Sequence, residues 1–376
     1  MAVTADVVVI GLGATGSAAL HQAARRGLRA IGVEQFGRGH DRGSSHGRSR
    51  IIRLGYFEHP SYVPLVQRAY AMWRELERQS GRALLTVTGI AEIGAPASEL
   101  VTGTLASSRR HGLAHEVLDA AELMRRYPAF TLPRDFVGVL QPDGGVLDPE
   151  QCIPAQLDLA QAAGAQLRLN ERVTAIEPLG AGVRVNTEAV VIEAGCAIVA
   201  AGAWASSLFP DFNLPLRVTR QVLMWFAPLE PALFAAPDFP VFMLESEFGI
   251  HYGFPLHARD GLKAARHHHA DETTDPLARD RPPGAEDEAM IRAGRAAYLP
   301  AANGRRLAAQ TCRYTMTPDG DFIIDRLPGC PQIILASPCS GHGFKFAPAI
   351  GEILAALARG ERPDADIERF RLGRFG

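Results

Sequence analysis

Three glycines near the start of the chain have the spacing of a loop that binds the diphosphate of a dinucleotide. Gly11, Gly13 and Gly16 form the pattern G-x-G-x-x-G directly after the apolar run of residues 7–10. The first glycine permits a tight turn, the second lets the backbone approach the diphosphate, and the third lets helix and strand pack closely. The pattern is weak evidence when it stands alone, so the elements around it decide its meaning.

Those elements predict a strand, a helix and a second strand, as in a parallel βαβ unit. Residues 7–10 predict a buried strand, residues 14–26 a helix that ends before Gly27, and residues 28–34 a second strand. The helix would direct unpaired N–H groups and its positive dipole end at the anion. Glu34 closes the second strand, where a carboxylate can accept the ribose hydroxyls and disfavours a 2′-phosphate. This context predicts nucleotide binding.

A later strand that leads to Gly202 favours FAD over NAD as the nucleotide. Residues 190–199 predict strand structure, and Gly202 follows in the sequence Ala-Ala-Gly-Ala. There it can bring a second stretch of backbone beside the diphosphate. A plain turn at the end of a strand is the alternative.

Two other segments combine hydroxyl, imidazole, guanidinium and thiol groups in loop-like sequence. Residues 44–53 contain Ser44, His46, Arg50 and Arg53. Residues 312–346 contain the series Cys-Arg-Tyr-Thr, Asp-Phe-Ile-Ile-Asp and Ser-Gly-His-Gly-Phe-Lys-Phe. Two isoleucines separate the arginines of the first segment, so part of it is expected to be buried. A buried arginine needs an anionic partner, here a substrate or the cofactor, and a solvated loop arginine is the alternative.

Together with the glycine motif, these segments closely resemble the monomeric sarcosine oxidase and N-methyltryptophan oxidase family of D-amino-acid-oxidase-like flavoproteins. The resemblance spans nearly the whole chain, and the C-terminal series is far more specific than the glycine motif. It implies a soluble α/β protein with a Rossmann-like FAD-binding domain and a substrate domain built on a mixed β-sheet. The expected FAD-binding domain comprises residues 1–83, 148–213 and 320–376, and the expected substrate domain comprises residues 84–147 and 214–319.

The resemblance also implies how FAD is held. Cys312 matches the cysteine whose sulfur bonds covalently to the 8α carbon of the flavin, whereas an isolated cysteine is more commonly a buried free thiol. Gly341 and Gly343 match a loop whose N–H groups face the flavin carbonyl, where negative charge accumulates on reduction. Cys330 and Cys339 match no position of the family and are expected to be structural. The full set of expected FAD-binding residues is Gly11, Gly13, Gly16, Glu34, Ser44, His46, Arg50, Val173, Gly202, Cys312, Gly341, Gly343 and Lys345.

The same resemblance implies a catalytic set. Arg53 and Lys345 match the pair that holds the substrate carboxylate, for which the planar fork of an arginine is well suited. Lys263 matches a lysine over the other flavin face that is tied to oxygen activation, since a cation there would stabilise superoxide. No motif indicates a general base. The expected catalytic residues are Lys263, Arg50, Arg53, Lys345, His267 and Tyr252.

Four features leave details of the site open. His267 falls where the family has an active-site histidine, but it begins a run of three histidines, for which an exposed metal-binding or solvated tract is the alternative. Arg48 stands where an acidic or small residue is expected, which leaves the local charge and substrate preference open. Residues 268–288 are polar and predict an excursion on the surface. The residues that could line an apolar substrate pocket, or else belong to the core, are Met224, Phe242, Met243 and Phe254.

Composition limits the partners and the compartment. The chain has 376 residues, with 39 lysines and arginines against 41 aspartates and glutamates, so no global field would attract nucleic acid or a membrane surface. No run of about 18 apolar residues could span a bilayer. The five cysteines are odd in number and include no C-x-x-C pair, which argues against a disulfide framework or a zinc site. We therefore expect a cytoplasmic monomer that holds no metal.

The reaction expected from these residues is the oxidation of a secondary amino acid such as sarcosine by FAD. The imine would hydrolyse to the primary amino acid and formaldehyde, and oxygen would be reduced to hydrogen peroxide. Two alternatives keep the flavin: an oxidase of a cyclic imino acid such as pipecolate or proline, and a dehydrogenase that passes electrons to a partner protein or a quinone. Lys263 favours the oxidase. A non-catalytic flavin-binding module is hard to reconcile with Cys312, Arg53 and Lys345.

Overall fold

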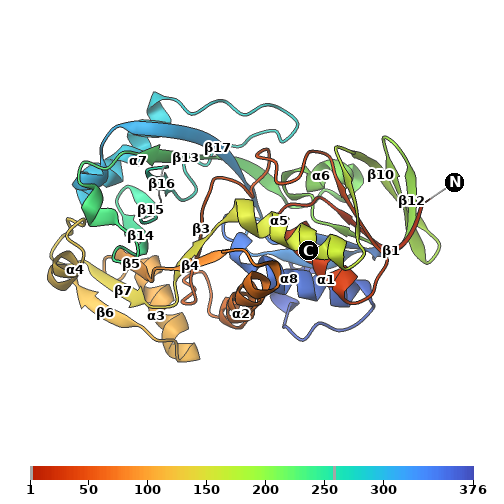
Figure 1. Ribbon diagram of the computed structural model, residues 1–376, viewed down its shortest axis with the longest axis horizontal. Helices are drawn as coiled ribbons and strands as arrows, with labels where there is room; N and C mark the ends of the chain where they lie inside the picture. The colour runs from red at the N-terminus through yellow and green to blue at the C-terminus, as the bar shows by residue number, and fades with distance from the viewer. Residues whose placement is uncertain (1–2, 257–259) are drawn as a thin grey trace.

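The computed structural model describes residues 3–256 and 260–376, and two eight-stranded sheets dominate it. The sheets lie toward opposite ends of an elongated molecule (Figure 1). The first sheet has the order β10-β11-β12-β1-β2-β9, with β19 paired to β12 and β18 to β19. Its strands are β1 (Val3–Ile10), β2 (Ala30–Glu34), β9 (Gln166–Leu169), β10 (Val173–Leu179), β11 (Gly182–Thr187), β12 (Val191–Val199), β18 (Ile323–Leu327) and β19 (Cys330–Ser337).

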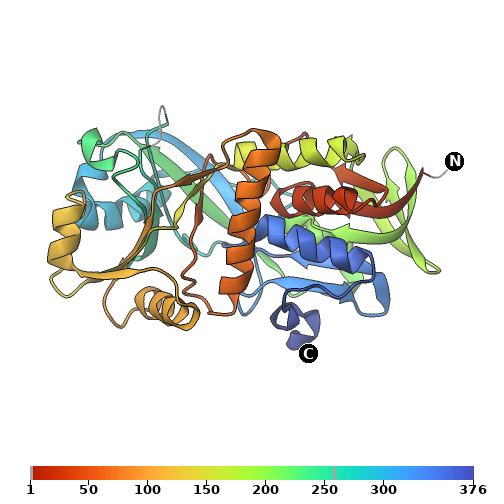
Figure 2. The ribbon, with the colours of Figure 1, turned by 60° about the horizontal axis from the view of Figure 1, so that its bottom comes forward.

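The centre of the first sheet is parallel. β1 pairs in parallel with β2 and β12, β2 with β9, and β12 with β19. Figure 2 shows three helices side by side along this sheet, α1 (Ala14–Arg25), α5 (Pro149–Ala162) and α8 (Ala347–Ala358), with α2 (Tyr62–Ser80) crossing between the two sheets. The helix α8 packs tightly on α1, because a methyl group at Gly351 would lie 2.6 Å from the backbone of Ala18. This is the parallel arrangement that the βαβ pattern predicted.

Side-chain alternation along β1 divides the core between the two faces of this sheet. Val7 and Val9 belong to the cluster that includes α1, α5 and α8, and Val8 and Ile10 belong to the cluster that includes β10 and β11. All of these side chains are buried. A strand that is buried on both faces needs a continuous apolar run, which is the reason residues 7–10 show no polar alternation.

The second sheet is mixed and has the order β17-β13-β16-β15-β14-β5-β7-β6. Only the pair β5–β14 is parallel among the pairs of described residues, and the others are antiparallel. Its strands are β5 (Ile90–Gly94), β6 (Glu116–Asp119), β7 (Val137–Gln141), β13 (Arg217–Phe226), β14 (Val241–Ser246), β15 (Gly249–Gly253), β16 (Leu262–Arg266) and β17 (Arg306–Met316). The helices α3 (Glu99–His111), α4 (Ala120–Arg126) and α7 (Ala285–Tyr298) accompany it, and α6 (Ala205–Leu208) follows β12.

A small third sheet joins the two halves. It has the order β3-β8-β4, with β3 (Arg50–Ile52), β4 (Leu85–Val87) and β8 (Gly145–Leu147) all antiparallel. The strands of the first sheet come from residues 3–34, 166–199 and 323–337, and those of the second from residues 90–141 and 217–316. We propose the domain boundaries given above on this basis.

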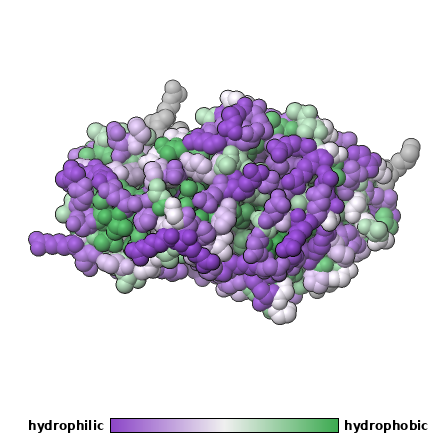
Figure 3. All heavy atoms as spheres, turned by 90° about the horizontal axis from the view of Figure 1, so that it is seen from below, coloured by the Kyte–Doolittle hydropathy of each residue, from purple (hydrophilic) through white to green (hydrophobic). Residues whose placement is uncertain are grey.

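The mixed α/β architecture agrees with the predicted fold class. The polar segment 268–288 is only partly a surface excursion, because Asp287 is 2 % exposed and accepts hydrogen bonds from Arg220 at 3.0 Å. Hydrophilic side chains dominate the face in Figure 3, with smaller hydrophobic areas between them. Within the described residues, no helix combines the length and the apolar character needed to cross a membrane.

Candidate active site

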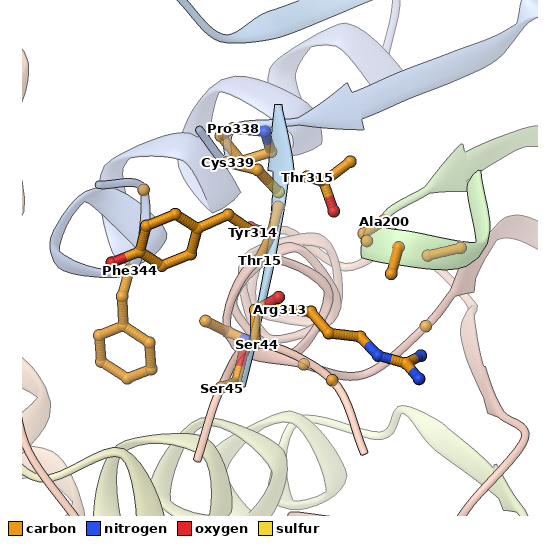
Figure 4. A pocket seen from close by; sticks show the side chains of 18 of the residues that line it. Thr15, Ser44, Ser45, Ala200, Arg313, Tyr314, Thr315, Pro338, Cys339 and Phe344 are labelled. Carbon is orange, nitrogen blue, oxygen red and sulfur yellow. The ribbon is translucent and has the colours of Figure 1, made fainter. Parts of the chain in front are cut away.

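A cavity of about 550 Å³ lies where the two sheets meet. Gly11 and Ala200 line it from the ends of β1 and β12, Tyr252 and Cys312 from β15 and β17, and Lys345 from the turn before α8. Figure 4 shows how residues from separate segments converge on it, among them Thr15, Ser44, Ala200, Arg313 and Cys339. One continuous cavity therefore extends from the glycine loop to Arg53 and Lys345.

The glycine loop has no room for side chains. Gly11 has φ +84°, and a Cβ there would lie 2.7 Å from the carbonyl oxygen of Ala200. A Cβ at Gly16 would lie 1.7 Å from the carbonyl oxygen of Gly11, so this residue sets the contact of α1 with the loop and does not line the cavity. Gly13 does line it, opposite the hydroxyl of Ser45. The loop thus presents bare backbone to the cavity, as a diphosphate site requires.

Glu34 lies beside this loop and supports it. Its carboxylate accepts hydrogen bonds from the backbone N–H of Leu12 at 2.8 Å and of Phe36 at 3.0 Å. Glu34 also lines the cavity, together with Val173 and Gly202. A carboxylate that is already oriented by two N–H donors suits the predicted recognition of ribose hydroxyls, which stays a prediction.

Cys312 lies on the cavity wall next to two nitrogenous side chains. Its sulfur is 3.8 Å from Nη2 of Arg50 and 4.0 Å from the carbonyl oxygen of Ser44. Burial raises the pKa of the thiol, but the neighbouring imidazole of His46 and guanidinium of Arg50 more than offset it and lower the pKa to about 7. A thiolate is the nucleophilic form of cysteine, so this site favours bond formation by sulfur near neutral pH. His46 itself does not line the cavity, because its ring turns to the carbonyl oxygen of Gly43.

Arg53 is buried and already has anionic partners within the protein. Its Nη2 donates to both carboxylate oxygens of Glu58, at 2.7 and 2.6 Å, and its Nη1 lies 3.7 Å from Glu92. The guanidinium also stacks on the rings of Tyr56 and Phe57, 4.2 and 4.7 Å from their centroids. A buried arginine needs an anion, and glutamates of the protein itself meet this need.

Lys345 faces the same end of the cavity as Arg53. Its ammonium donates to the carbonyl oxygen of His342 at 2.8 Å and lies 3.5 Å from the hydroxyl of Tyr56. Burial and the charge of Arg53 lower the pKa of Lys345 to about 7. Burial alone would raise the pKa of the Glu58 carboxyl, but Arg53, His342 and Lys345 hold it below the usual value. Two cations and at least one carboxylate thus share this end.

Lys263 is not on the cavity wall. Its ammonium donates to the carbonyl oxygens of Gly47 at 2.6 Å and Ser49 at 2.9 Å, and these two residues do not line the cavity either. Burial and the nearby charge of Arg50 hold the pKa of Lys263 well below its ordinary value. Its predicted position over a flavin face stays a prediction.

The histidine run divides between two environments. His267 lines the cavity, 3.3 Å from the hydroxyl of Tyr314, and burial holds its pKa well below the ordinary value. His269 is buried elsewhere, 2.9 Å from Asp287. No cluster of His, Cys, Asp and Glu able to hold a metal occurs among the described residues. The register of the run therefore places His267 at the site.

Several other expectations need correction. Arg48 does not line the cavity and pairs with Asp260 at 2.6 Å. Cys339, expected to be structural only, lines the cavity. Of the four candidate apolar residues, Met243 and Phe254 line the cavity, whereas Met224 and Phe242 are core.

Glu58 and Glu92 were missed from sequence. Glu58 follows Arg53 by five residues, a spacing with no special meaning in a loop. The sequence did contain an indication that Glu92 has a special role. It is the one charged residue in the buried strand β5, whose other members are Ile90, Ala91, Ile93 and Gly94. A carboxylate in such a strand requires a partner, and Arg53 is the nearest charge.

Residues 6–357 match the model of a family described as FAD dependent oxidoreductase. The chain belongs to this family. The flavoprotein is 41 % identical to a monomeric sarcosine oxidase from Streptomyces avermitilis, over 95 % of this chain and 94 % of that protein. It is 36 % identical to an N-methyl-L-tryptophan oxidase from Yersinia pestis, over 98 % of this chain and 99 % of that protein.

The fold of this FAD-dependent oxidoreductase also resembles that of NikD, described as an unusual amino acid oxidase essential for nikkomycin biosynthesis. The TM-score is 0.86 at 26 % identity, over 98 % of this chain and 97 % of the other. The cavity suits FAD, since bare backbone at Gly11 and Gly13 adjoins the acid Glu34, and a thiol of lowered pKa lies further along. These residues would hold the diphosphate, the ribose and the flavin respectively.

We predict that Cys312 is reactive near neutral pH in protein prepared without FAD. Because its pKa is about 7, the rate of alkylation by iodoacetamide should rise through pH 7 and then level off. Cys196, whose pKa burial raises to about 11, is the internal comparison and should react little below pH 9. His46→Ala should move the midpoint of the Cys312 alkylation rate to higher pH, because one of the two side chains that lower the thiol pKa is then lost. Mass spectrometry of each cysteine peptide measures this, and an unchanged midpoint in the variant would contradict the assignment.

Proposed function

We propose that this flavoprotein is an oxidase of secondary amino acids with an N-methyl group, such as sarcosine. The observation that carries the proposal is the pair Arg53 and Lys345 at the end of the cavity away from the glycine loop. A chain of formal charge −2 attracts anions only through such local cations. The relatives named as sarcosine and N-methyltryptophan oxidases support the same substrate class.

When bound, FAD supplies the two-electron acceptor for the reaction, which the protein itself lacks. The amine substrate must be neutral to release hydride, and the imine product then hydrolyses to the primary amino acid and formaldehyde, while oxygen is reduced to hydrogen peroxide. Two further side chains that line the cavity, His267 and Tyr252, are held uncharged. Burial keeps His267 neutral by lowering its pKa and keeps Tyr252 protonated by raising its pKa to about 12.

The protein is also proposed to act as a cytoplasmic monomer. All five cysteines are free, as expected in a reducing compartment. The name of the Streptomyces relative includes the word monomeric. Gel filtration of the purified flavoprotein tests the oligomeric state directly.

The thiol of Cys312 is proposed to bond covalently to FAD. Its place on the cavity wall and its lowered pKa support this role. Cys339 also lines the cavity, but burial raises its pKa, which disfavours the thiolate. Of the two cysteines at the cavity, Cys312 is therefore the better nucleophile.

We predict that FAD stays with the polypeptide after denaturation in acid. Cys312→Ala should release all of the yellow cofactor into the supernatant, whereas the matched variant Cys339→Ala should release none. Absorbance of pellet and supernatant, with intact mass, measures the link. FAD that washes out of denatured wild type would refute the covalent bond while leaving the family assignment intact.

Lys263 is proposed to assist oxygen. Its buried ammonium is held by two backbone carbonyl oxygens close to the cavity, where a cation would stabilise superoxide as oxygen accepts the first electron.

We predict that Lys263→Met slows reoxidation by oxygen much more than anaerobic reduction by substrate. Stopped-flow absorbance gives both rates in one preparation, so a general loss of structure would lower both. Equal slowing of the two half-reactions would show that Lys263 only supports the turn of residues 47–49.

Arg53 and Lys345 are proposed to clamp the substrate carboxylate. Arg53 already binds one carboxylate, because its Nη2 donates to both oxygens of Glu58, and the planar fork of a guanidinium suits such a group. A ligand carboxylate that makes the same contact would take the place of the Glu58 carboxylate at Nη2 of Arg53.

We predict that wild type strongly prefers an N-methyl amino acid to its amide and that Arg53→Ala loses most of this preference. A charge-assisted pair contributes roughly 1.5–3 kcal/mol, which corresponds to about tenfold to hundredfold in kcat/KM. Arg53→Lys should not restore it, because an ammonium lacks the planar fork. The acid-to-amide ratio in a peroxide assay is the readout, since a loss of folded protein does not change a ratio. Equal rates on acid and amide in wild type would shift the substrate class from amino acids to simple amines.

A further inference from the structure

Four ionisable side chains converge where the substrate carboxylate is proposed to bind. Arg53 and Lys345 are the cations, and Glu58 and Glu92 are the carboxylates. When all four are ionised their charges cancel. A bound carboxylate then adds an unbalanced negative charge to a site with little water, which is unfavourable unless one of the four groups changes.

The two carboxylates differ in what they can do. The side chain of Glu58 is 20 % exposed and lines the cavity, so it can turn toward the open space. The side chain of Glu92 is 0 % exposed and does not line the cavity. It projects from β5, where Met243 of β14 and Val139 of β7 are its neighbours in the sheet. The side chain of Glu92 therefore cannot turn toward solvent as that of Glu58 can.

The surroundings of Glu92 also offer little to keep it ionised. Neither of its oxygens has a hydrogen-bond partner among the described residues, and the nearest charge is Nη1 of Arg53 at 3.7 Å. Burial raises the pKa of this carboxyl to about 7 despite Arg53. The ionisable groups that act on it are Arg53, Tyr56 and Glu58 from the segment after β3 and Lys345 from the segment before α8, while α3 contributes the hydroxyl of Thr104.

We propose that Glu92 takes up one proton from solvent when a carboxylate ligand binds at Arg53, and that it thereby sets the pH range in which anionic substrates bind. The inference rests on the carboxylate site proposed above. The step is a simple protonation of a carboxylate and needs no other reactant. Glu92 acts on the ligand through Arg53 and is a positioning residue, because it touches neither substrate nor FAD.

The sign of the pH dependence follows from linkage. Below about pH 7 Glu92 already holds its proton, and ligand affinity is at its maximum. Above pH 7 each binding event consumes one proton, so Kd should rise about tenfold per pH unit. Lys345 titrates in the same range, and loss of its charge would also weaken binding. The effects of the two groups on binding are separable. Removing the charge of Glu92 abolishes its proton uptake and tightens binding above pH 7, whereas the same change lowers the pKa of Lys345 and weakens binding.

The test uses the FAD-loaded enzyme and methoxyacetate, in which an ether oxygen replaces the amine of sarcosine. Titrations followed by flavin absorbance from pH 6 to pH 9 give Kd for wild type, Glu92→Gln and the control Glu177→Gln, an exposed glutamate on β10 of the other sheet. We expect Glu92→Gln to bind about tenfold more tightly than wild type at pH 8, and its Kd to rise less steeply than that of wild type from pH 6 to pH 8, because only Lys345 then titrates. The control should follow wild type.

Other outcomes overturn the inference. If Glu92→Gln binds more weakly at pH 8 and keeps the full pH dependence, Lys345 is the group that titrates. If it binds more weakly by the same factor at every pH, Glu92 is only structural. A flat pH profile in wild type also overturns the proposal.

A second variant and a second ligand serve as controls for these conclusions. Glu92→Met, an uncharged side chain of similar length, replaces Glu92→Gln if the latter does not fold, and the same result is expected of it. Methoxyacetamide is the uncharged ligand. If wild type binds the amide as tightly as the acid, the carboxylate site itself is wrong, and the proposed function fails independently of Glu92.

Discussion

The need to balance a buried guanidinium organises this molecule. Arg53 lies just after β3, in the small sheet that joins the two halves, and its anionic partners are Glu58 of the same segment and Glu92. Glu92 belongs to the second sheet, whereas Lys345, a second cation at the same end of the cavity, precedes α8, which covers the first. A charge inside a protein is tolerated only when other charges and dipoles surround it. The ion pair of Arg53 with Glu92 therefore also ties the segment after β3 to the second sheet.

Burial then tunes the chemistry of that space. It lowers the pKa of Lys345 and raises that of Glu92, so that both lie near 7. At Cys312 neighbouring groups work against burial and lower the thiol pKa to about 7 as well. Such values arise because the cavity excludes water while packing charged side chains against one another. The site is consequently sensitive to the charge of whatever enters it.

Much of the fold and part of the site could be predicted from the sequence. The strand before Gly11, the helix that begins at Ala14 and the family resemblance were all correct, because each depends on residues close together in the chain. The positions of Lys263 and Arg48 were not predictable in the same way. Lys263 donates to the carbonyl oxygens of Gly47 and Ser49, and Arg48 pairs with Asp260, since the path of a loop is set by what packs beneath it.

The sequence by itself determined the dinucleotide loop, the α/β class and which side chains carry chemistry, because spacing and side-chain type are local properties. Only the tertiary structure decided which groups meet. Glu92 is 39 positions from Arg53 in the sequence, and it reaches the guanidinium because β5 lies between β14 and β7. Protonation states followed from the same packing, since a pKa depends on burial and on neighbours that are distant along the chain.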